Sequence, residues 1–405
     1  MTNRVLILGG QGRIGNSVAQ DLVAYTQAQI IVTGRQQTGE RKKGWGNEPV
    51  DAGTRGRGDA ENGNSTSYFV HPQQQERTVS QTNSSPVEFL ALDLADREGL
   101  RKAIASSNLV VHCAGPFLYR DGSVLEICIE QGVNYLDVSD NRAFTQKALT
   151  SREKAAAAGV TAIVNSGIFP GISNSMVRHD VEQLDEAERI HLSYVVAGSG
   201  GAGVTVMRTT FLGLQEPFAA WIDNQWQIVK PYTDREKIKF PAPYGNAGVY
   251  WFDMPEAFTL VDSFGVNTVI TKFGSIPDFY NYLTWIAAHI FPSSWLKNPG
   301  GIEFLSYVSH FMTDVSDRFS GIGVAIRSEV QGLKDGKSTT VGSTLVHENT
   351  AVAAGVGTGS LAQLMLNGKL HKPGVWPVEQ ALSTELFEQT MQNRGIKINF
   401  DSCSA

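Results

Sequence analysis

The stretch Arg4-Val5-Leu6-Ile7-Leu8-Gly9-Gly10-Gln11-Gly12-Arg13-Ile14-Gly15 decides the fold. Its first five residues form a short apolar run rich in branched side chains, which is typical of a strand buried on both faces of a parallel sheet. The apolar positions of residues 17–25 then recur at helical spacing. The sequence therefore predicts a strand, a glycine turn and a helix.

Three glycines of this turn, Gly10, Gly12 and Gly15, have the spacing of a dinucleotide-binding loop. The first permits the tight turn, the second lets a pyrophosphate approach the backbone, and the third lets helix and strand pack closely. The phosphates would lie at the positive end of the helix. We predict a cofactor site that also includes Arg13 and Ile14. The alternative is a glycine turn that has lost its ligand.

The end of the second predicted strand, residues 30–33, indicates which dinucleotide binds. A carboxylate there binds the ribose 2′-hydroxyl of NAD, whereas a cation accommodates the 2′-phosphate of NADP. Here Gly34-Arg35 closes the strand, and no acid follows until Glu40. A guanidinium can bind a phosphate through two hydrogen bonds. The sequence therefore predicts NADP, with Arg13 as a second candidate cation. The alternative is that Arg35 is a solvated loop residue.

Strand and helix patterns alternate again from residue 87 to residue 165, which predicts a doubly wound parallel sheet with right-handed crossovers. We predict that this Rossmann domain spans residues 1–170. Residues 36–86 interrupt the pattern with Gly, Gln, Asn, Ser, Thr and charge, so we expect a disordered surface loop. Both a tolerated insertion and a partner-binding segment are consistent with such a loop.

Two further groups of residues follow predicted strands at the carboxyl edge of this sheet, where ligands of such folds bind. Asp93 ends the third strand, and it either meets an adenine amino group or caps the helix that starts near residue 94. Ala114, Gly115 and Phe117 follow the fourth strand. We expect these three residues to line the nicotinamide side of the crevice.

Composition excludes several classes of protein. The 405 residues are 41% apolar, which suits two or three packed domains. The net charge of -6, without any block of Lys and Arg, argues against a nucleic-acid partner. Three scattered cysteines encode neither a disulfide framework nor a metal site. Because neither a signal peptide nor a membrane-spanning run is evident, we expect a cytoplasmic protein in a reducing compartment.

The rest of the chain has a different pattern. Residues 171–348 contain strand patterns far from any helix, which predicts an α+β domain for substrate binding or dimerisation. Residues 349–405 revert to helix, over residues 349–368 and 378–393, and we expect these helices to pack on the first domain. The middle region is rich in aromatic residues, which suit a packed core, an apolar pocket, a homodimer interface or a membrane surface.

Several of these motifs resemble the saccharopine dehydrogenase-like family. They are the glycine loop, the strand end at Thr33-Gly34-Arg35, and residues 113–139, 169–174 and 372–377. The resemblance implies a Rossmann domain completed by C-terminal helices, an inserted α+β domain, and NADP(H). It also implies chemistry on a C=N bond between amino-acid skeletons, although some relatives act on lipid-like or polyketide substrates.

The middle region departs from a saccharopine-type enzyme because its cations are sparse, whereas a tricarboxylate would need several arginines. Arg208 is the candidate substrate anchor, with an ordinary salt bridge as the alternative. Tyr119, two residues past Phe117, and Asp140, after the fifth strand, are the candidate proton donors. No metal site is predicted.

The sequence as a whole predicts an NADP-dependent oxidoreductase. We expect hydride transfer to or from a C=N, C=O or activated C=C bond of a small or lipophilic substrate held under the second domain. Two alternatives stay open at this point. One is a noncatalytic NADP-binding sensor or scaffold, and the other is a membrane-peripheral reductase of a lipid or polyketide.

Overall fold

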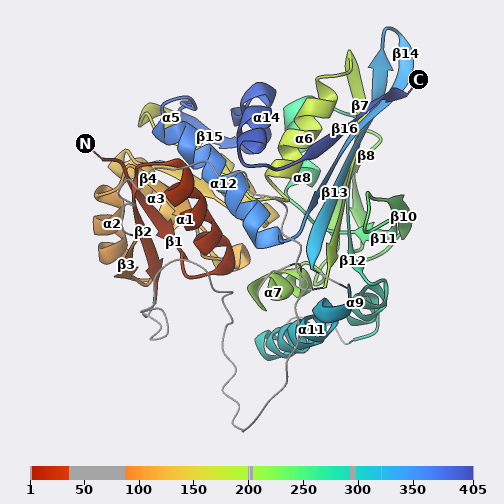
Figure 1. The fold of residues 1–405 in the computed structure, drawn as a ribbon, viewed down its shortest axis with the longest axis horizontal. Helices are drawn as coiled ribbons and strands as arrows, with labels where there is room; N and C mark the ends of the chain where they lie inside the picture. The colour runs from red at the N-terminus through yellow and green to blue at the C-terminus, as the bar shows by residue number, and fades with distance from the viewer. Residues whose placement is uncertain are drawn as a thin grey trace, which may run out of the picture.

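Two β-sheets lie side by side in the computed structural model (Figure 1), which describes residues 2–35, 87–198, 200, 204–291, 298–320 and 322–404. The strands of the first sheet are all parallel, and the second sheet is mixed. The predicted fold class is therefore confirmed: a parallel α/β sheet is accompanied by a second, mixed sheet with its own helices. The loop predicted over residues 36–86 lies outside the described residues.

The first sheet has the strand order β15-β6-β5-β4-β1-β2-β3. Alternate residues of β1 enter two different apolar clusters, Val5 and Ile7 in one and Leu6 and Leu8 in the other. Both faces of the sheet are therefore covered, as the continuous apolar run predicts. Its elements up to residue 164 are β1 (Arg4–Leu8), α1 (Arg13–Tyr25), β2 (Gln29–Gly34), β3 (Val87–Ala91), α2 (Arg97–Ala105), β4 (Leu109–His112), the 3-10 helix Phe117–Tyr119, α3 (Ser123–Gln131), β5 (Asn134–Asp137), α4 (Arg142–Leu149), α5 (Arg152–Ala157) and β6 (Thr161–Val164).

The second sheet has the order β10-β11-β12-β7-β13-β14-β16, with the β8–β9 hairpin attached to β12. Only the pairing of β12 with β7 is parallel among the described strands of this sheet. The elements from residue 172 to residue 347 are α6 (Ile172–Val181), β7 (Glu186–Ala197), α7 (Val204–Leu212), β8 (Phe218–Ile222), β9 (Gln225–Val229), β10 (Glu236–Lys239), β11 (Asn246–Trp251), α8 (Glu256–Phe264), β12 (Thr268–Ile276), α9 (Phe279–His289), α11 (Pro299–Ser320), β13 (Gly323–Lys334) and β14 (Lys337–His347).

The C-terminal segment contributes to both sheets. It consists of α12 (Thr350–Leu366), β15 (Gly374–Pro377), α13 (Val378–Ala381), α14 (Thr384–Asn393) and β16 (Ile398–Ser404). Helix α12 packs very closely on α1, because a Cβ atom on Gly355 would lie only 2.4 Å from the Cβ atom of Ser17. Strand β15 extends the first sheet and β16 extends the second. The domain boundaries at residues 170 and 348 stay a prediction.

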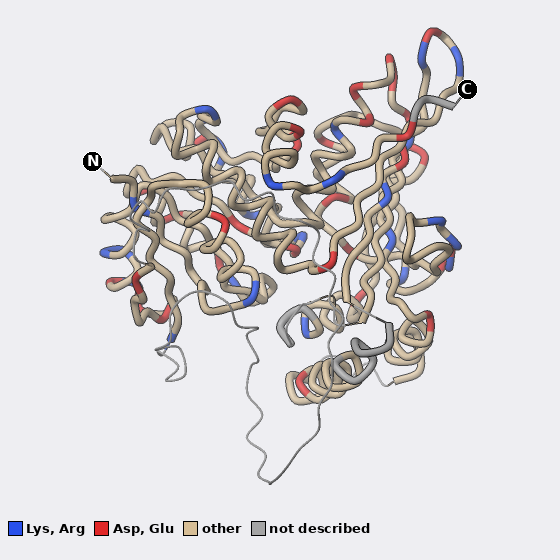
Figure 2. Tube along the Cα trace, in the orientation of Figure 1, with Lys and Arg blue, Asp and Glu red and all other residues tan. Residues whose placement is uncertain are grey.

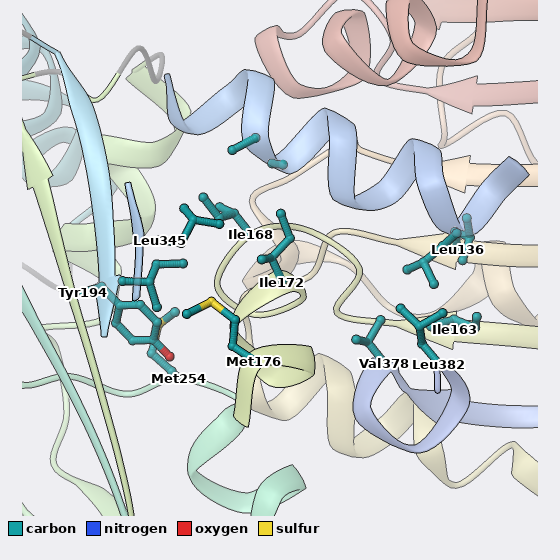
Figure 3. Packing of buried hydrophobic residues seen from close by; sticks show 14 of the residues in the cluster. Leu136, Ile163, Ile168, Ile172, Met176, Tyr194, Met254, Leu345, Val378 and Leu382 are labelled. Atoms are coloured by element: carbon teal, nitrogen blue, oxygen red, sulfur yellow. The ribbon is translucent and has the colours of Figure 1, made fainter. Parts of the chain in front are cut away.

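One apolar cluster runs from the first sheet to the second (Figure 3). Leu136 of β5 and Ile163 of β6 belong to it, as do Met176 of α6 and Tyr194 of β7. The two sheets therefore share a continuous core, and the crevice between them is bounded by packed side chains.

The structure corrects the helical interpretation of the chain end. The helix predicted over residues 378–393 is broken into α13 and α14, because the backbone at Leu382 and Ser383 is extended and Ser383 caps α14. Residues 374–377 and 398–404 are strands, so this segment is not purely helical. Among the described residues, no helix is long and apolar enough to cross a bilayer.

Candidate active site

The glycine loop connects β1 to α1. Gly9 adopts a φ of +75°, and the Gly12 N–H donates to the Gly9 carbonyl oxygen at 2.9 Å, which closes the turn. A Cβ atom on Gly10 would lie 2.5 Å from the Cβ atom of Val32, and one on Gly15 would lie 2.5 Å from the Gly9 oxygen. Close approach of neighbouring atoms therefore requires glycine at both positions.

The start of α1 fits a pyrophosphate. Gly12 is the N-cap residue, no side chain caps the helix there, and the first turn contains no acid. The amides of a first helical turn lack partners within the helix and attract anions. Arg13, Ile14 and Gly15 open this turn. Their backbone N–H groups would hold the phosphates of a bound dinucleotide.

The end of β2 places a cation beside this loop. The strand ends at Gly34, where a Cβ atom would lie 2.2 Å from Oε1 of Gln11 in the glycine loop. Strand and loop therefore touch here, and the exposed Arg35 follows directly. This is the position at which a Rossmann fold selects between NAD and NADP.

Asp93 does not cap α2, so this alternative is wrong. Its carboxylate accepts the Ala95 N–H at 3.0 Å, within the turn that precedes the helix. The N-cap is Asp96, whose side chain accepts the Gly99 N–H at 3.0 Å. Because Asp93 is exposed at the end of β3 and caps no helix, its contact with adenine stays a prediction.

Arg120 is a residue of this edge that the sequence interpretation missed. Its guanidinium donates to the carbonyl oxygens of Ala114 at 2.7 Å and Gly115 at 3.3 Å, which fixes the chain after β4. Burial lowers the pKa of Arg120; Asp93 opposes this change, and Arg35 adds to it. Arg120 therefore lies within electrostatic range of both Arg35 and Asp93. The only sequence signal was a cation five residues after Gly115.

A cavity of about 590 Å³ lies between the carboxyl edge of the first sheet and the second sheet. Phe117 forms part of its wall, and this ring packs 5.0 Å from the rings of both His112 and Phe144. The opposite walls come from the second sheet and from α7, α9 and α11. They are largely apolar, and include Met207, Phe211, Phe218, Phe252, Phe273, Leu283, Ile286, Phe304 and Met312; Phe169, in the segment before α6, also lines the cavity.

Four charged side chains are among the described lining residues, namely Asp140, Arg142, Glu216 and Asp253. The single cation, Arg142, pairs with Asp253 at 2.7 Å. Burial raises the pKa of Asp253, and Arg142 acts in the opposite direction. Burial also raises the pKa of Asp140 to about 6. The lining therefore contains one neutralised cation and an acid that titrates near neutral pH.

The other two candidate catalytic residues lie outside this lining. Tyr119 is exposed at the end of the 3-10 helix, while its neighbour Leu118 lines the cavity. Arg208 of α7 forms an ion pair with Glu303 of α11 at 2.6 Å. Of the three candidates, the structure brings only Asp140 to the cavity, and the catalytic roles of Tyr119 and Arg208 stay predictions.

Several known proteins are similar to this chain in sequence or in fold. The family model for the saccharopine dehydrogenase NADP binding domain matches residues 66–163. A carboxynorspermidine synthase of Vibrio cholerae is 24% identical over 347 residues, which cover 78% of this chain and 83% of that protein. The solved structure of the L-Glu-forming saccharopine dehydrogenase of Saccharomyces cerevisiae superimposes with a TM-score of 0.63 at 14% identity, over 99% of this chain and 100% of that one. The chain is therefore similar to proteins of the saccharopine dehydrogenase type, in sequence over most of its length and in fold over all of it.

The matched NADP-binding domain model and these oxidoreductase relatives support an NADP-dependent oxidoreductase. A carboxyaminopropylagmatine dehydrogenase of Synechocystis is also similar, with 22% identity over 338 residues that cover 75% of this chain and 83% of that protein. The range matched by the family model begins at residue 66, after the glycine loop. The role of the loop in cofactor binding is therefore supported by its own geometry.

Proposed function

We propose that this chain transfers a hydride between NADP and a C=N bond of a substrate with an apolar body. The cavity beside Phe117 is the observation that carries the proposal, because its walls are largely apolar and its single described cation is paired. A C=O or activated C=C bond accepts a hydride in the same way and is the alternative acceptor. The relatives whose names contain carboxynorspermidine and carboxyaminopropylagmatine support amine chemistry at the reacting bond.

The charges of the lining favour this substrate class over a polycarboxylate. Asp140, Glu216 and Asp253 are acids, whereas Arg142 is the single cation among the described lining residues. A substrate with several carboxylates would need several cations to replace its water shell. The imine nitrogen, once it has taken up a proton, would instead be attracted by carboxylates. We therefore propose that the substrate carries few carboxylates and has an apolar body.

Reduction of a C=N bond needs a proton as well as a hydride, since one C–H and one N–H bond form while the π bond breaks. NADPH supplies the hydride when it is bound. Asp140 lines the cavity, and its pKa of about 6 keeps part of its population protonated near neutral pH. It can therefore hold the proton that this step consumes. The apolar side chains around it would exclude water from the reacting bond.

Oxidation of NADPH by two matched imines tests this proposal. Both imines are formed from the same amine, one with a long alkyl aldehyde and the other with a 2-oxo dicarboxylic acid. We expect kcat/KM to be at least about tenfold higher for the alkyl imine, because its body loses more contact with water in the cavity. A preference for the dicarboxylate would contradict the substrate class. Absence of turnover with imines, ketones and enones alike would contradict the proposed reaction.

A further inference from the structure

We propose that α9 and α11 form a docking face for the surface of a zwitterionic phospholipid bilayer. This face, called here the aromatic face, consists of the exposed apolar side chains Phe279, Tyr282, Trp285, Ile290, Phe304, Tyr307, Val308 and Phe311. The hydroxyl of Tyr280 in α9 donates to the carbonyl oxygen of Met312 in α11 at 3.0 Å, so the two helices are joined. Both lie at one end of the second sheet (Figure 1).

The apolar stripe of α11 is exposed, whereas the apolar stripe of a helix packed on a core is buried. Phe304, Tyr307, Val308 and Phe311 follow one another at i, i+3, i+4 and i+7, the spacing of an apolar stripe that normally faces a core. Here the side chains of Tyr307 and Phe311 are 60% and 70% exposed. The other side of the helix is also apolar where Leu305 and Met312 line the cavity. A helix that is apolar on both sides needs an apolar partner outside the protein.

The charge of the aromatic face indicates which partner this is. Helix α9 contains no Asp, Glu, Lys or Arg, and residues 299–313 of α11 contain only Glu303, which is paired with Arg208. Figure 2 shows few charged residues along α9 and along the part of α11 that it does not draw in grey. The described residues of the face form no basic cluster that would attract anionic lipid, whereas its Trp and Tyr side chains suit the interfacial layer of a bilayer. A zwitterionic surface therefore complements it in charge.

The aromatic face is continuous with the cavity. Phe304 and Val308 belong to the face and also line the cavity, and the side chain of Phe304 is 58% exposed. An apolar molecule dissolved in a bilayer could therefore reach the cavity past α11 without crossing water. This route for the substrate rests on the proposed function. Docking on the bilayer does not rest on the proposed function, because it depends only on the outer side chains of the aromatic face.

Flotation of the full chain with phosphatidylcholine vesicles tests the docking face. We expect the wild-type protein to float with these vesicles, to remain bound in high salt, and to gain nothing from added anionic lipid. The double variant Tyr307→Ser/Phe311→Ser should lose about tenfold or more of its vesicle-bound fraction, since two large apolar side chains leave the face. Neither residue lines the cavity.

The β9 hairpin offers a matched control. Trp226 and Ile228 are 48% and 74% exposed there and belong to β9, which pairs with β8. Trp226→Ser/Ile228→Ser should float like the wild type. Equal flotation of the two double variants, failure of the wild type to float, or flotation only with anionic lipid would overturn the proposal. So would a wild-type dimer in solution that Tyr307→Ser/Phe311→Ser converts to a monomer without any vesicle binding.

The docking proposal and the proposed function can fail separately. NADPH binding and the thermal unfolding midpoint of each variant report whether it is folded. A folded wild-type protein that oxidises NADPH with an apolar imine but does not float would overturn docking alone. Flotation without turnover would contradict the proposed reaction and leave docking intact.

Discussion

Asp140 is the residue on which the proposed proton transfer depends. Burial raises its pKa to about 6, so the protonated form becomes scarcer as the pH rises through that value. If this form supplies the proton, kcat/KM, which reports the pKa values of the free enzyme, falls above about pH 6. Asp140→Asn should lower kcat about 100-fold and abolish this limb of the pH profile, because an amide cannot donate the proton.

Steady-state NADPH oxidation from pH 5 to pH 8 measures this effect. The matched control is Asp121→Asn, since Asp121 is exposed and not in the cavity lining, and its pKa is lowered chiefly by hydrogen bonds to Ser123. An Asp140→Asn variant that keeps both the wild-type kcat and the wild-type profile would exclude Asp140 as the proton donor.

Arg120 is a second single residue with a testable role, and it acts through its hydrogen bonds to the backbone. It donates to the carbonyl oxygens of Ala114 and Gly115, and so positions the segment that leads to Phe117. Arg120→Ala should raise the KM for NADPH about tenfold, because two charge-assisted hydrogen bonds that hold this wall are lost. Arg97→Ala is the control, since Arg97 forms an exposed pair with Asp121 nearby. Equal KM values for the two variants would contradict a positioning role for Arg120.

At the scale of elements, a buried network connects α6, β7 and α8. Glu256 of α8 is fully buried and accepts hydrogen bonds from Tyr194 at 2.7 Å and Ser173 at 3.2 Å. Burial raises the pKa of Glu256 from 4.5 to about 7, and the neighbouring Glu379 acts in the same direction. Folding therefore favours the protonated carboxyl. Its contribution to stability is complete below pH 4.5 and is lost as the pH rises through 7.

Glu256→Gln should flatten the dependence of stability on pH. Between pH 5 and pH 8 the unfolding free energy of the wild type should fall more than that of the variant, by on the order of 2 to 3 kcal/mol, because the amide never ionises. Urea denaturation at each pH measures the difference. Glu98→Gln, on the exposed side of α2, is the control. Parallel curves for wild type and Glu256→Gln would show that Glu256 is ionised throughout this range.

Elements of the first sheet could be predicted from the sequence because their signals are local. Residues 4–8 are apolar without alternation, and glycines then separate strand from helix. The sequence leaves Asp93 open as a cap of α2, whereas Asp96 caps this helix; the two residues carry the same side chain, and only the backbone decides which one caps. The break at Leu382 was likewise hidden by helical periodicity on both sides of it.

The arrangement of the whole molecule could be predicted only in part. Strand β16 pairs with β14, and β7 pairs with both β12 and β13, over separations that no local pattern encodes. The glycine loop and Asp140 could be proposed because each follows a predicted strand. An apolar pocket was one interpretation of the aromatic middle region, but the residues of its walls come from separate elements and could not be named from the sequence. The aromatic side chains of the middle region are divided among the buried core, which includes Tyr232 and Tyr250, the cavity and the exposed face of α9 and α11.

The central claim concerns the whole molecule: it binds NADP at the edge of the first sheet and uses it in the cavity under the second. Fluorescence titration of the wild type with NADPH and with NADH tests this claim most directly, with Arg35→Ala measured in parallel. We predict at least about tenfold tighter binding of NADPH, and loss of that preference in Arg35→Ala with little change for NADH, because one charge-assisted phosphate contact is removed. Equal affinity of the wild type for the two cofactors, or no binding of either, would contradict the account.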